Sequence, residues 1–165
     1  MFASAAGSPN FTPQASIVNY YTTKSQMGGH RDDLELTFEE PVVSVSCGLP
    51  AIFLLGGATK EEAPTPILVR SGDVMVLGGK SRLRYHGCAR VIANRADGEP
   101  NVPPAAGEAG PGQVQGLEEG KGEERDEARR EAEREERDAV IEYLKTHRIN
   151  VNVRQVLPPG LSAIF

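Results

Sequence analysis

Residues 42–57 read VVSVSCGLPAIFLLGG. The first six residues alternate apolar side chains with Ser, which is the period-two pattern of a strand with one buried face. Gly48-Leu49-Pro50 is a turn signal, and residues 51–55 form a second apolar run that ends at Gly56-Gly57. This stretch predicts two strands, and we expect them to pair as a hairpin.

Short apolar runs of the same kind lie on both sides of this stretch, separated by Gly, Pro and Asp at roughly regular spacing. Between residues 15 and 92, no segment with helical periodicity separates these apolar runs. The crossover helices of a parallel α/β sheet are therefore not expected there. The pattern predicts a mainly β fold: a sandwich, a barrel or a jelly roll. The expected strands are residues 15–21, 42–47, 51–55, 67–69, 74–77, 81–86 and 148–156.

The chain of 165 residues divides by composition into one core and several appended segments. A stretch rich in Gly, Pro, Ala and Glu is expected to be disordered, and the Glu/Arg-rich stretch after it is expected to be a solvated helix that gains a buried face from residue 139. The expected parts are a lead-in at 1–14, a core at 15–93 and 139–157, a low-complexity insert at 94–122, a charged helix at 123–146 and a tail at 158–165.

The net charge of −5 comes from one segment, because residues 117–138 hold 11 acidic and 6 basic side chains and the rest of the chain is balanced. The charge therefore argues neither for nor against a nucleic-acid partner. No apolar run reaches the 18 residues typical of a membrane span, and no basic residue precedes Lys24, so we expect no membrane partner and no targeting signal. Two cysteines without metal-type spacing, Cys47 and Cys88, fit a reducing compartment, with Cys47 expected to be buried. An intracellular location is expected: nucleus, cytoplasm or mitochondrion.

The sequence Gly29-His30-Arg31-Asp32-Asp33 holds the strongest chemical signal. In an extended segment, side chains two residues apart point to the same side, so His30 and Asp32 can reach one metal ion. His86 supplies a second imidazole, and two His with one carboxylate match the facial triad of non-haem Fe(II) oxygenases. Zinc remains the rival metal for this set of ligands.

Another signal lies in the strand expected at 148–156, where basic and amide side chains alternate with apolar ones. The polar face consists of Arg148, Asn150, Asn152 and Arg154. If this face points into a small barrel, burying it requires an anionic partner, and the planar guanidinium suits a carboxylate. A small diacid is the natural ligand, and Asn19 and Tyr21, on one face of the first strand, are candidates to hydrogen-bond the same molecule. The alternative for this pair is an amphipathic strand in which Tyr21 is half-buried. The alternative for residues 148–156 is a solvent-exposed strand with two unrelated Arg side chains. His147 directly precedes Arg148, and neighbouring side chains in a strand point to opposite faces, so His147 is expected to point away from the face that carries Arg148.

Three motifs in this order, HRD from residue 30, GDVMVLGGKSRLRYHG from residue 72 and RINVNVRQ from residue 148, resemble the AlkB family of Fe(II)/2-oxoglutarate dioxygenases. The phrases VNYY, PVVSVSCGLPAIFLLGG and YLKTHRINVNVRQVL are most similar to the AlkB homolog 1 branch. The resemblance covers residues 15–93 and 139–157, which is most of the foldable chain.

The resemblance implies a double-stranded β-helix, that is, a jelly-roll or cupin-like core. It implies Fe(II) held by His30, Asp32 and His86. It further implies that Arg148 binds the distal carboxylate of 2-oxoglutarate and that Arg154 steadies the metal end, including Asp32. The remaining residues implied at the 2-oxoglutarate site are Asn19, Tyr21, Asn150 and Asn152, the last at a position where many family members carry Thr.

The implied activity is O2-dependent hydroxylation of an N-methyl group on a flipped or single-stranded base of tRNA or DNA. The implied products are formaldehyde, succinate and CO2. Two alternatives remain open. The N-terminal lid that family members place over the nucleotide is not recognisable ahead of Asn19, so the chain is alternatively a catalytically weak iron and 2-oxoglutarate-binding module. The other alternative is a cupin-like domain that binds a different metal.

Overall fold

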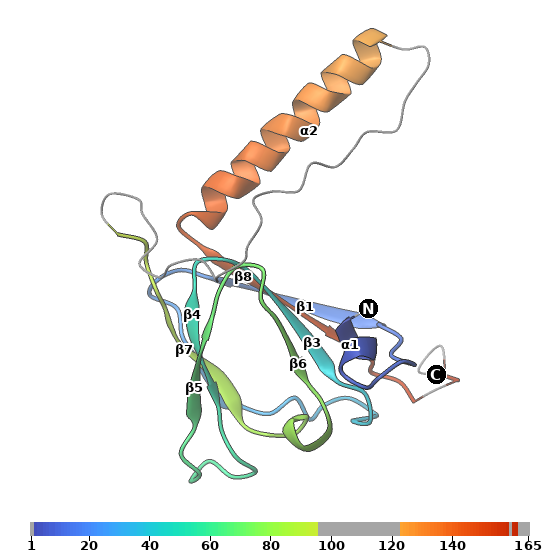
Figure 1. The fold of residues 1–165 in the computed structure, drawn as a ribbon, viewed down its shortest axis with the longest axis vertical. Coiled ribbons are helices and arrows are strands. Elements are labelled where there is room, and N and C mark those ends of the chain that lie inside the picture. The colour runs from blue at the N-terminus through green and yellow to red at the C-terminus, as the bar shows by residue number, and fades with distance from the viewer. Residues whose placement is uncertain (1, 96–122, 159, 162–165) are drawn as a thin grey trace.

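The computed structural model describes residues 2–95, 123–158, 160 and 161 (Figure 1). Most of the low-complexity insert expected at 94–122 therefore lies outside the described residues. Within the described part, the chain forms two four-stranded antiparallel sheets that face one another. The predicted mainly β, double-stranded β-helix fold is confirmed.

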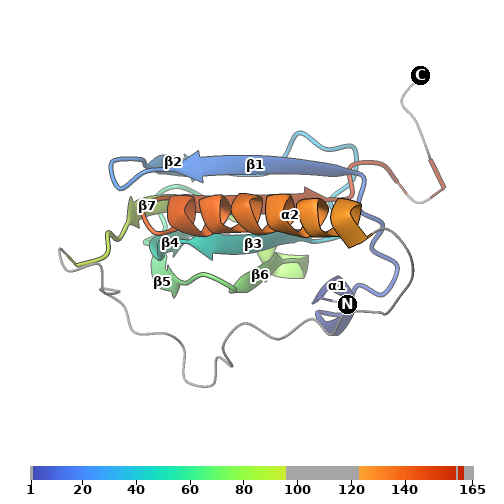
Figure 2. The same cartoon turned by 90° about the horizontal axis from the view of Figure 1, so that it is seen from above.

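Each sheet combines strands from distant parts of the chain, as the crossed element order shows (Figure 2). In order across the first sheet, the strands are β1 (Ala15–Tyr21), β8 (Arg148–Arg154), β3 (Val42–Gly48) and β6 (Val74–Leu77). In order across the second sheet, they are β2 (Met27–His30), β7 (His86–Val91), β4 (Ala51–Leu55) and β5 (Thr65–Val69).

The last strand, β8, lies in the middle of the first sheet and pairs with β1 on one side and β3 on the other. Its register places Arg148 opposite Tyr21 on β1 and opposite Gly48 on β3. Arg148 and Asn150 are buried, whereas Ile149, Val151 and Val153 on the opposite face are only half-buried. The polar face of this strand therefore points into the space between the sheets.

The β3 strand repeats this arrangement, because its two serines, Ser44 and Ser46, are buried in the interior. Cys47, on the outer face of the same strand, is half-buried, so the expectation that it is buried is wrong. Val42 and Ser44 line a cavity between the sheets, whereas Val43, Val45 and Cys47 point to the opposite side of the strand. On that side Val43 is buried, and Val45 and Cys47 are half-buried.

The predicted hairpin of residues 42–55 is wrong, because β3 belongs to the first sheet and β4 to the second. Gly48 has a φ of +80°, and Leu49 donates its backbone N–H to the His147 carbonyl (2.9 Å) and is buried. These contacts turn the chain from one layer to the other, so the turn signal marks a corner of the jelly roll and not a hairpin.

The strand predicted at residues 81–86 is also wrong. A 3₁₀ turn, Gly79–Ser81, and further turn residues occupy most of this range, and β7 begins at His86. The Ser81 hydroxyl donates to the Gly78 carbonyl (2.8 Å), and the side chain of Arg82 is drawn into the interior. Arg82 donates to the backbone carbonyls of Glu40 and Asp32, 42 and 50 residues away, and these long-range contacts outweigh the strand pattern of the local sequence.

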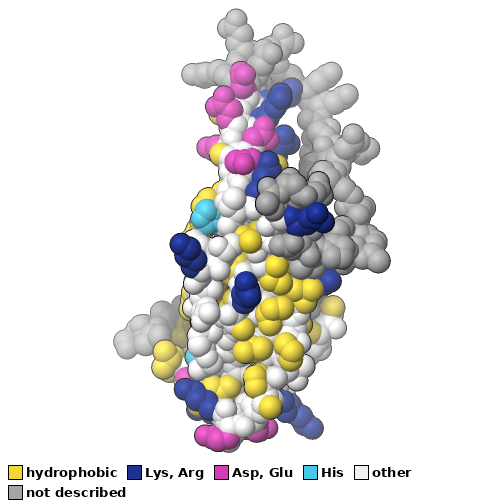
Figure 3. Space-filling view, turned by 90° about the vertical axis from the view of Figure 1, so that its left-hand side faces the viewer, with side chains coloured by type: hydrophobic (Ala, Val, Ile, Leu, Met, Phe, Trp, Pro, Cys, Tyr) yellow, Lys and Arg dark blue, Asp and Glu magenta, His cyan; other side chains and the backbone are white. Residues whose placement is uncertain are grey.

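The outer face of the second sheet carries half-buried apolar side chains, because Ala51 and Phe53 point inward and their neighbours Ile52 and Leu54 point outward. Figure 3 views this side of the molecule and shows hydrophobic side chains spread over it, with basic side chains among them.

Two helices complete the described chain. The short α1 (Phe2–Ala5) lies in the lead-in, and α2 (Glu123–Leu144) projects from the barrel (Figure 1). Val140, Ile141 and Tyr143 are exposed, so the buried face expected from residue 139 is wrong. His147 instead stacks on Tyr143, with ring centroids 4.0 Å apart. Among the described residues, no helix has the length and apolarity that crossing a membrane requires.

Candidate active site

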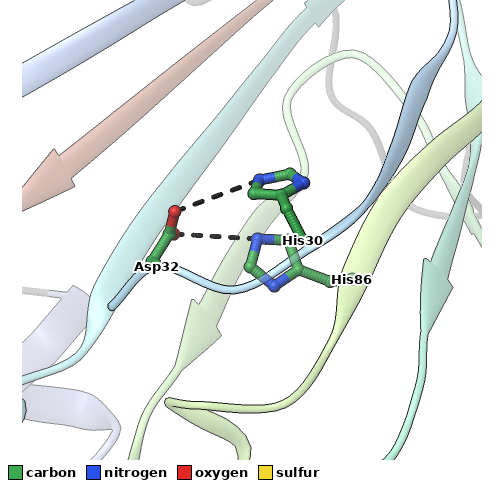
Figure 4. A group of neighbouring side chains, drawn as sticks. All are labelled: His30, Asp32 and His86. Atoms are coloured by element: carbon green, nitrogen blue, oxygen red, sulfur yellow. Dashed lines mark ion pairs between the residues drawn. The ribbon is translucent and has the colours of Figure 1, made fainter. Parts of the chain in front are cut away.

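His30, Asp32 and His86 converge at one end of the second sheet (Figure 4). His30 ends β2 and His86 begins β7, and the register of the two strands pairs these residues directly. The Asp32 carboxylate lies 4.0 Å from His30 Nε2 through Oδ1 and 3.7 Å from His86 Nε2 through Oδ2. One ligand atom from each residue lies within 4.8 Å of the others, so the donor set fits one divalent ion with open positions.

Backbone carbonyls fix the orientation of both imidazoles. His30 Nδ1 lies 3.0 Å from the Gly28 carbonyl oxygen, and His86 Nδ1 lies 3.1 Å from that of Arg84. Because a carbonyl can only accept a hydrogen bond, each Nδ1 carries the proton and each Nε2 keeps its lone pair for a metal. Burial lowers the pKa of His86 despite the opposing effects of the Arg84 carbonyl and Asp32, so its neutral, metal-binding form is favoured.

A cavity between the two sheets begins at these three residues and extends to Arg148. Arg148 is only 4% exposed and donates from Nη2 to Ser46 Oγ (2.9 Å) and from Nη1 to the Leu49 carbonyl (3.4 Å). Among the residues that the structure describes, its buried Nε has no hydrogen-bond partner. Burial also lowers the pKa of this guanidinium, because its charged form is poorly solvated there. A buried cation with an unused donor fits the carboxylate of a small ligand.

Tyr21 stands beside Arg148 in the same cavity, and burial raises the pKa of its phenol. The phenol therefore remains a hydrogen-bond donor at neutral pH. Its hydroxyl donates to the Met27 sulfur (3.6 Å), which is a weak acceptor. A carboxylate bound by Arg148 would offer a far better one.

The three amides expected at the 2-oxoglutarate site differ in their placement. Asn150 and Asn152 line the cavity, and Asn150 donates to Ser44 Oγ (2.7 Å) and to the Val45 carbonyl (3.2 Å). Asn19 pairs with Asn150 in the register and is half-buried, but it does not line the cavity.

Arg154 lies at the metal end of the site. It donates from Nη2 to Asp32 Oδ1 (2.9 Å) and from Nη1 to Glu35 Oε1 (2.8 Å). Arg148 therefore lines the cavity, whereas Arg154, on the same face of β8, reaches the site through its contact with Asp32. The ligand-binding roles expected for the two arginines stay predictions.

Several residues that shape the site were not identified from the sequence. Ser44 and Ser46 accept the hydrogen bonds of Asn150 and Arg148, and their alternation along an apolar strand was the available signal. Arg82 binds the backbone of Asp32 across 50 residues, and its place in a predicted strand gave no sign of this contact.

The sequence matches the family model described as the 2OG-Fe(II) oxygenase superfamily over residues 1–154. It is 39% identical over 155 residues to the nucleic acid dioxygenase ALKBH1 of Homo sapiens, covering 94% of this chain and 37% of that protein. It is 37% identical over 146 residues to the DNA N(6)-methyladenine demethylase ALKBH1A of Arabidopsis thaliana, covering 88% of this chain and 35% of that protein.

The fold is similar to the solved structure of OsALKBH1, with a TM-score of 0.56 and 26% sequence identity, over 89% of this chain and 52% of that chain. The chain thus spans a little over a third of the length of the two curated relatives and about half of this solved chain.

Proposed function

The chain belongs to the AlkB family of the 2OG-Fe(II) oxygenase superfamily, and we propose that it is an Fe(II)- and 2-oxoglutarate-dependent oxidative demethylase of N-methylated nucleobases. The observation that carries the proposal is the shared cavity, which joins a His-Asp-His cluster at one end to the buried guanidinium of Arg148 at the other. A zinc site would give the second half of this cavity no role.

In the proposed site, His30, Asp32 and His86 hold the iron, and 2-oxoglutarate lies along the cavity with its distal carboxylate at Arg148 and Tyr21. Asn150 and Asn152 line the cavity, and Asn19 pairs with Asn150 across β1 and β8. When bound, Fe(II) and 2-oxoglutarate supply, with O2, the hydroxylation of an N-methyl group, which yields formaldehyde, succinate and CO2.

The residues of the chain supply geometry and charge. Arg148 and Tyr21 orient the keto acid, since a guanidinium and a phenol donate to the same carboxylate. Arg154 neutralises the Asp32 carboxylate through a direct hydrogen bond, while the Gly28 and Arg84 carbonyls keep both imidazoles in the tautomer that binds metal.

The proposed substrate is a methylated base in DNA or tRNA. The human relative is a nucleic acid dioxygenase and the Arabidopsis relative a DNA N(6)-methyladenine demethylase, which supports a nucleic-acid substrate. Because Asp32 and His86 are buried between two sheets, the methyl group has to be presented by a single-stranded or flipped nucleotide.

The test is turnover by the purified chain supplied anaerobically with Fe(II) and 2-oxoglutarate and then exposed to O2. Single-stranded DNA with N6-methyladenine and tRNA with N1-methyladenine are the substrates, and unmethylated strands are the control. Formaldehyde and succinate should form together and only with the methylated strands. The Asp32→Asn variant should be inactive, whereas Asp33→Asn, which alters an exposed Arg31–Asp33 pair, should keep its activity.

If the chain binds Fe(II) and 2-oxoglutarate but no methylated strand loses its methyl group, the demethylase proposal is wrong and the binding-module alternative holds. If Arg148→Ala leaves 2-oxoglutarate binding unchanged, the site belongs to a different ligand.

A further inference from the structure

Four charged side chains are packed behind the proposed iron site, and two of them, Glu35 and Arg82, have no role in the reaction described above. The Glu35 side chain is 5% exposed and that of Arg82 is 2% exposed. Charges are rarely buried this deeply unless they are paired. Here Glu35 and Arg82 are paired with each other, and further contacts link both to Asp32.

The four side chains form a closed ring of contacts. Arg154 bridges the carboxylates of Asp32 and Glu35 (2.9 and 2.8 Å). Arg82 donates from Nη1 to the backbone carbonyl of Asp32 (2.7 Å) and pairs through Nη2 with Glu35 Oε2 (3.4 Å). It also donates from Nε to the Glu40 carbonyl (3.1 Å). The side chain and the backbone of Asp32 are thus held by different arginines, and Glu35 holds both arginines.

We propose that Glu35 and Arg82 are positioning residues that fix the Asp32 carboxylate for metal binding. This inference rests on the proposed function, because it takes Asp32 to be an iron ligand. With Oδ1 held by Arg154, Oδ2 remains for the ion, 3.7 Å from His86 Nε2. The ring therefore selects single-oxygen coordination by Asp32 and sets the affinity of the site.

The charge balance explains why an acid is needed at position 35. Asp32 alone cannot neutralise two buried guanidiniums, and Glu35 makes the group of four neutral. Burial acts to raise the pKa of Glu35, but its backbone N–H together with Arg82 and Arg154 outweighs burial and brings the pKa below its usual value. Glu35 is therefore ionised at neutral pH and holds Arg154 in line with Asp32.

The loop that holds Leu34, Glu35 and Leu36 is oriented by the charge of Glu35 and not by the burial of its apolar side chains. Glu35 points inward while its neighbours Leu34 and Leu36 are 95% and 61% exposed. The Leu36 N–H donates to the Val156 carbonyl (3.1 Å), which ties the loop to the segment after β8. Two leucines left in solvent on either side of a buried carboxylate are the reverse of the usual pattern.

The test compares Glu35→Gln with the conservative Glu35→Asp and Arg82→Lys variants and with the exposed control Asp33→Asn. Mn(II) affinity is measured by electron paramagnetic resonance titration, and the ligand field by the visible spectrum of the Co(II)-loaded chain. Circular dichroism and melting temperature report folding. Loss of supporting contacts around a metal ligand costs about 10- to 100-fold in metal affinity in known sites.

We expect Glu35→Gln to weaken Mn(II) binding by about this factor and to alter the Co(II) spectrum. Glu35→Asp and Arg82→Lys, which keep the charge, should show smaller changes in the same direction, and Asp33→Asn should match the unaltered chain. A variant that melts earlier but keeps the Mn(II) affinity and Co(II) spectrum would show a structural role only and overturn the proposal. If Glu35→Gln does not fold, unchanged metal binding by both conservative variants overturns it equally.

Failure of the inference is distinct from failure of the proposed function. Equal metal affinity in all variants rejects positioning but leaves the iron site intact. An unaltered chain that binds no metal rejects both. Metal binding without demethylation rejects only the demethylase proposal.

Discussion

The guanidinium of Arg148 and the hydroxyl of Ser46 are hydrogen-bonded at 2.9 Å, although 102 residues separate them in the sequence. Both side chains are almost wholly buried, on two adjacent strands of the first sheet. This bond holds the cation in the wall of the cavity, and among the described residues the Arg148 Nε has no hydrogen-bond partner.

Replacing Arg148 with Gln should raise the dissociation constant of 2-oxoglutarate by about 100-fold, because charge-assisted bonds in a buried site are worth about 2–3 kcal/mol. Isothermal titration in the presence of Mn(II), without O2, measures the change. Arg90→Gln, an exposed position on β7, is the control and should bind normally. Equal affinities would place the diacid elsewhere.

Replacing Ser46 with Ala should destabilise the chain by about 1–3 kcal/mol, because a buried guanidinium N–H loses its acceptor. Cys47→Ser, at the neighbouring half-buried position on the outer face of β3, should lower the free energy of unfolding by less. Urea unfolding gives both values. A larger loss at position 47 would mean that the faces of β3 are assigned the wrong way round.

Replacing Gly87 with Ala should weaken metal binding and lower stability by about 1–3 kcal/mol, the usual range for overpacking. A Cβ at this position would lie 2.6 Å from the Met27 carbonyl oxygen, so β2, which carries His30, has to move. The control is Gly28→Ala, where a Cβ meets nothing within 4 Å. Mn(II) titration and thermal melting should give a lower metal affinity and a lower melting temperature for Gly87→Ala than for Gly28→Ala.

Adding Mn(II) at about 100 times its dissociation constant should stabilise the folded chain by about 2.7 kcal/mol, since the ion binds only the folded site. Thermal melting with and without a chelator measures this shift. Asp32→Asn should abolish it. A shift that survives in this variant would mean that the ion binds outside the His30, Asp32 and His86 cluster.

The raised pKa of Tyr21, caused first by burial and then by the nearby Cys88, predicts a loss of stability at alkaline pH. The folded chain holds the phenolic proton more tightly than the unfolded chain does. The contribution is therefore complete below the ordinary pKa of 10.0 and is lost as the pH rises above it. Between pH 8 and pH 11, the free energy of unfolding, measured with a chemical denaturant, should fall more steeply for the unaltered chain than for Tyr21→Phe. Parallel curves for the two chains would contradict a raised pKa of Tyr21.

The expected site residues show which features are readable from sequence. His30 and Asp32 lie on one segment, and Arg148 and Arg154 on one strand, so alternation alone predicts which of them share a side. Glu35 and Arg82 were missed because their importance comes from each other, across a loop and a turn that have no periodic pattern.

The sequence by itself determined the alternation along each strand, the ligand types and the mainly β class, because side-chain direction in an extended chain is a local property. Only the tertiary structure decided which sheet each strand joins, that residues 81–85 form a turn, and that the serine face of β3 is the interior. These choices depend on contacts between residues far apart in the sequence, such as those of Arg82 with Asp32 and of Arg148 with Ser46, which are 50 and 102 positions apart. Local preferences cannot encode them, since the free energy of burying and pairing charges exists only once the sheets have come together.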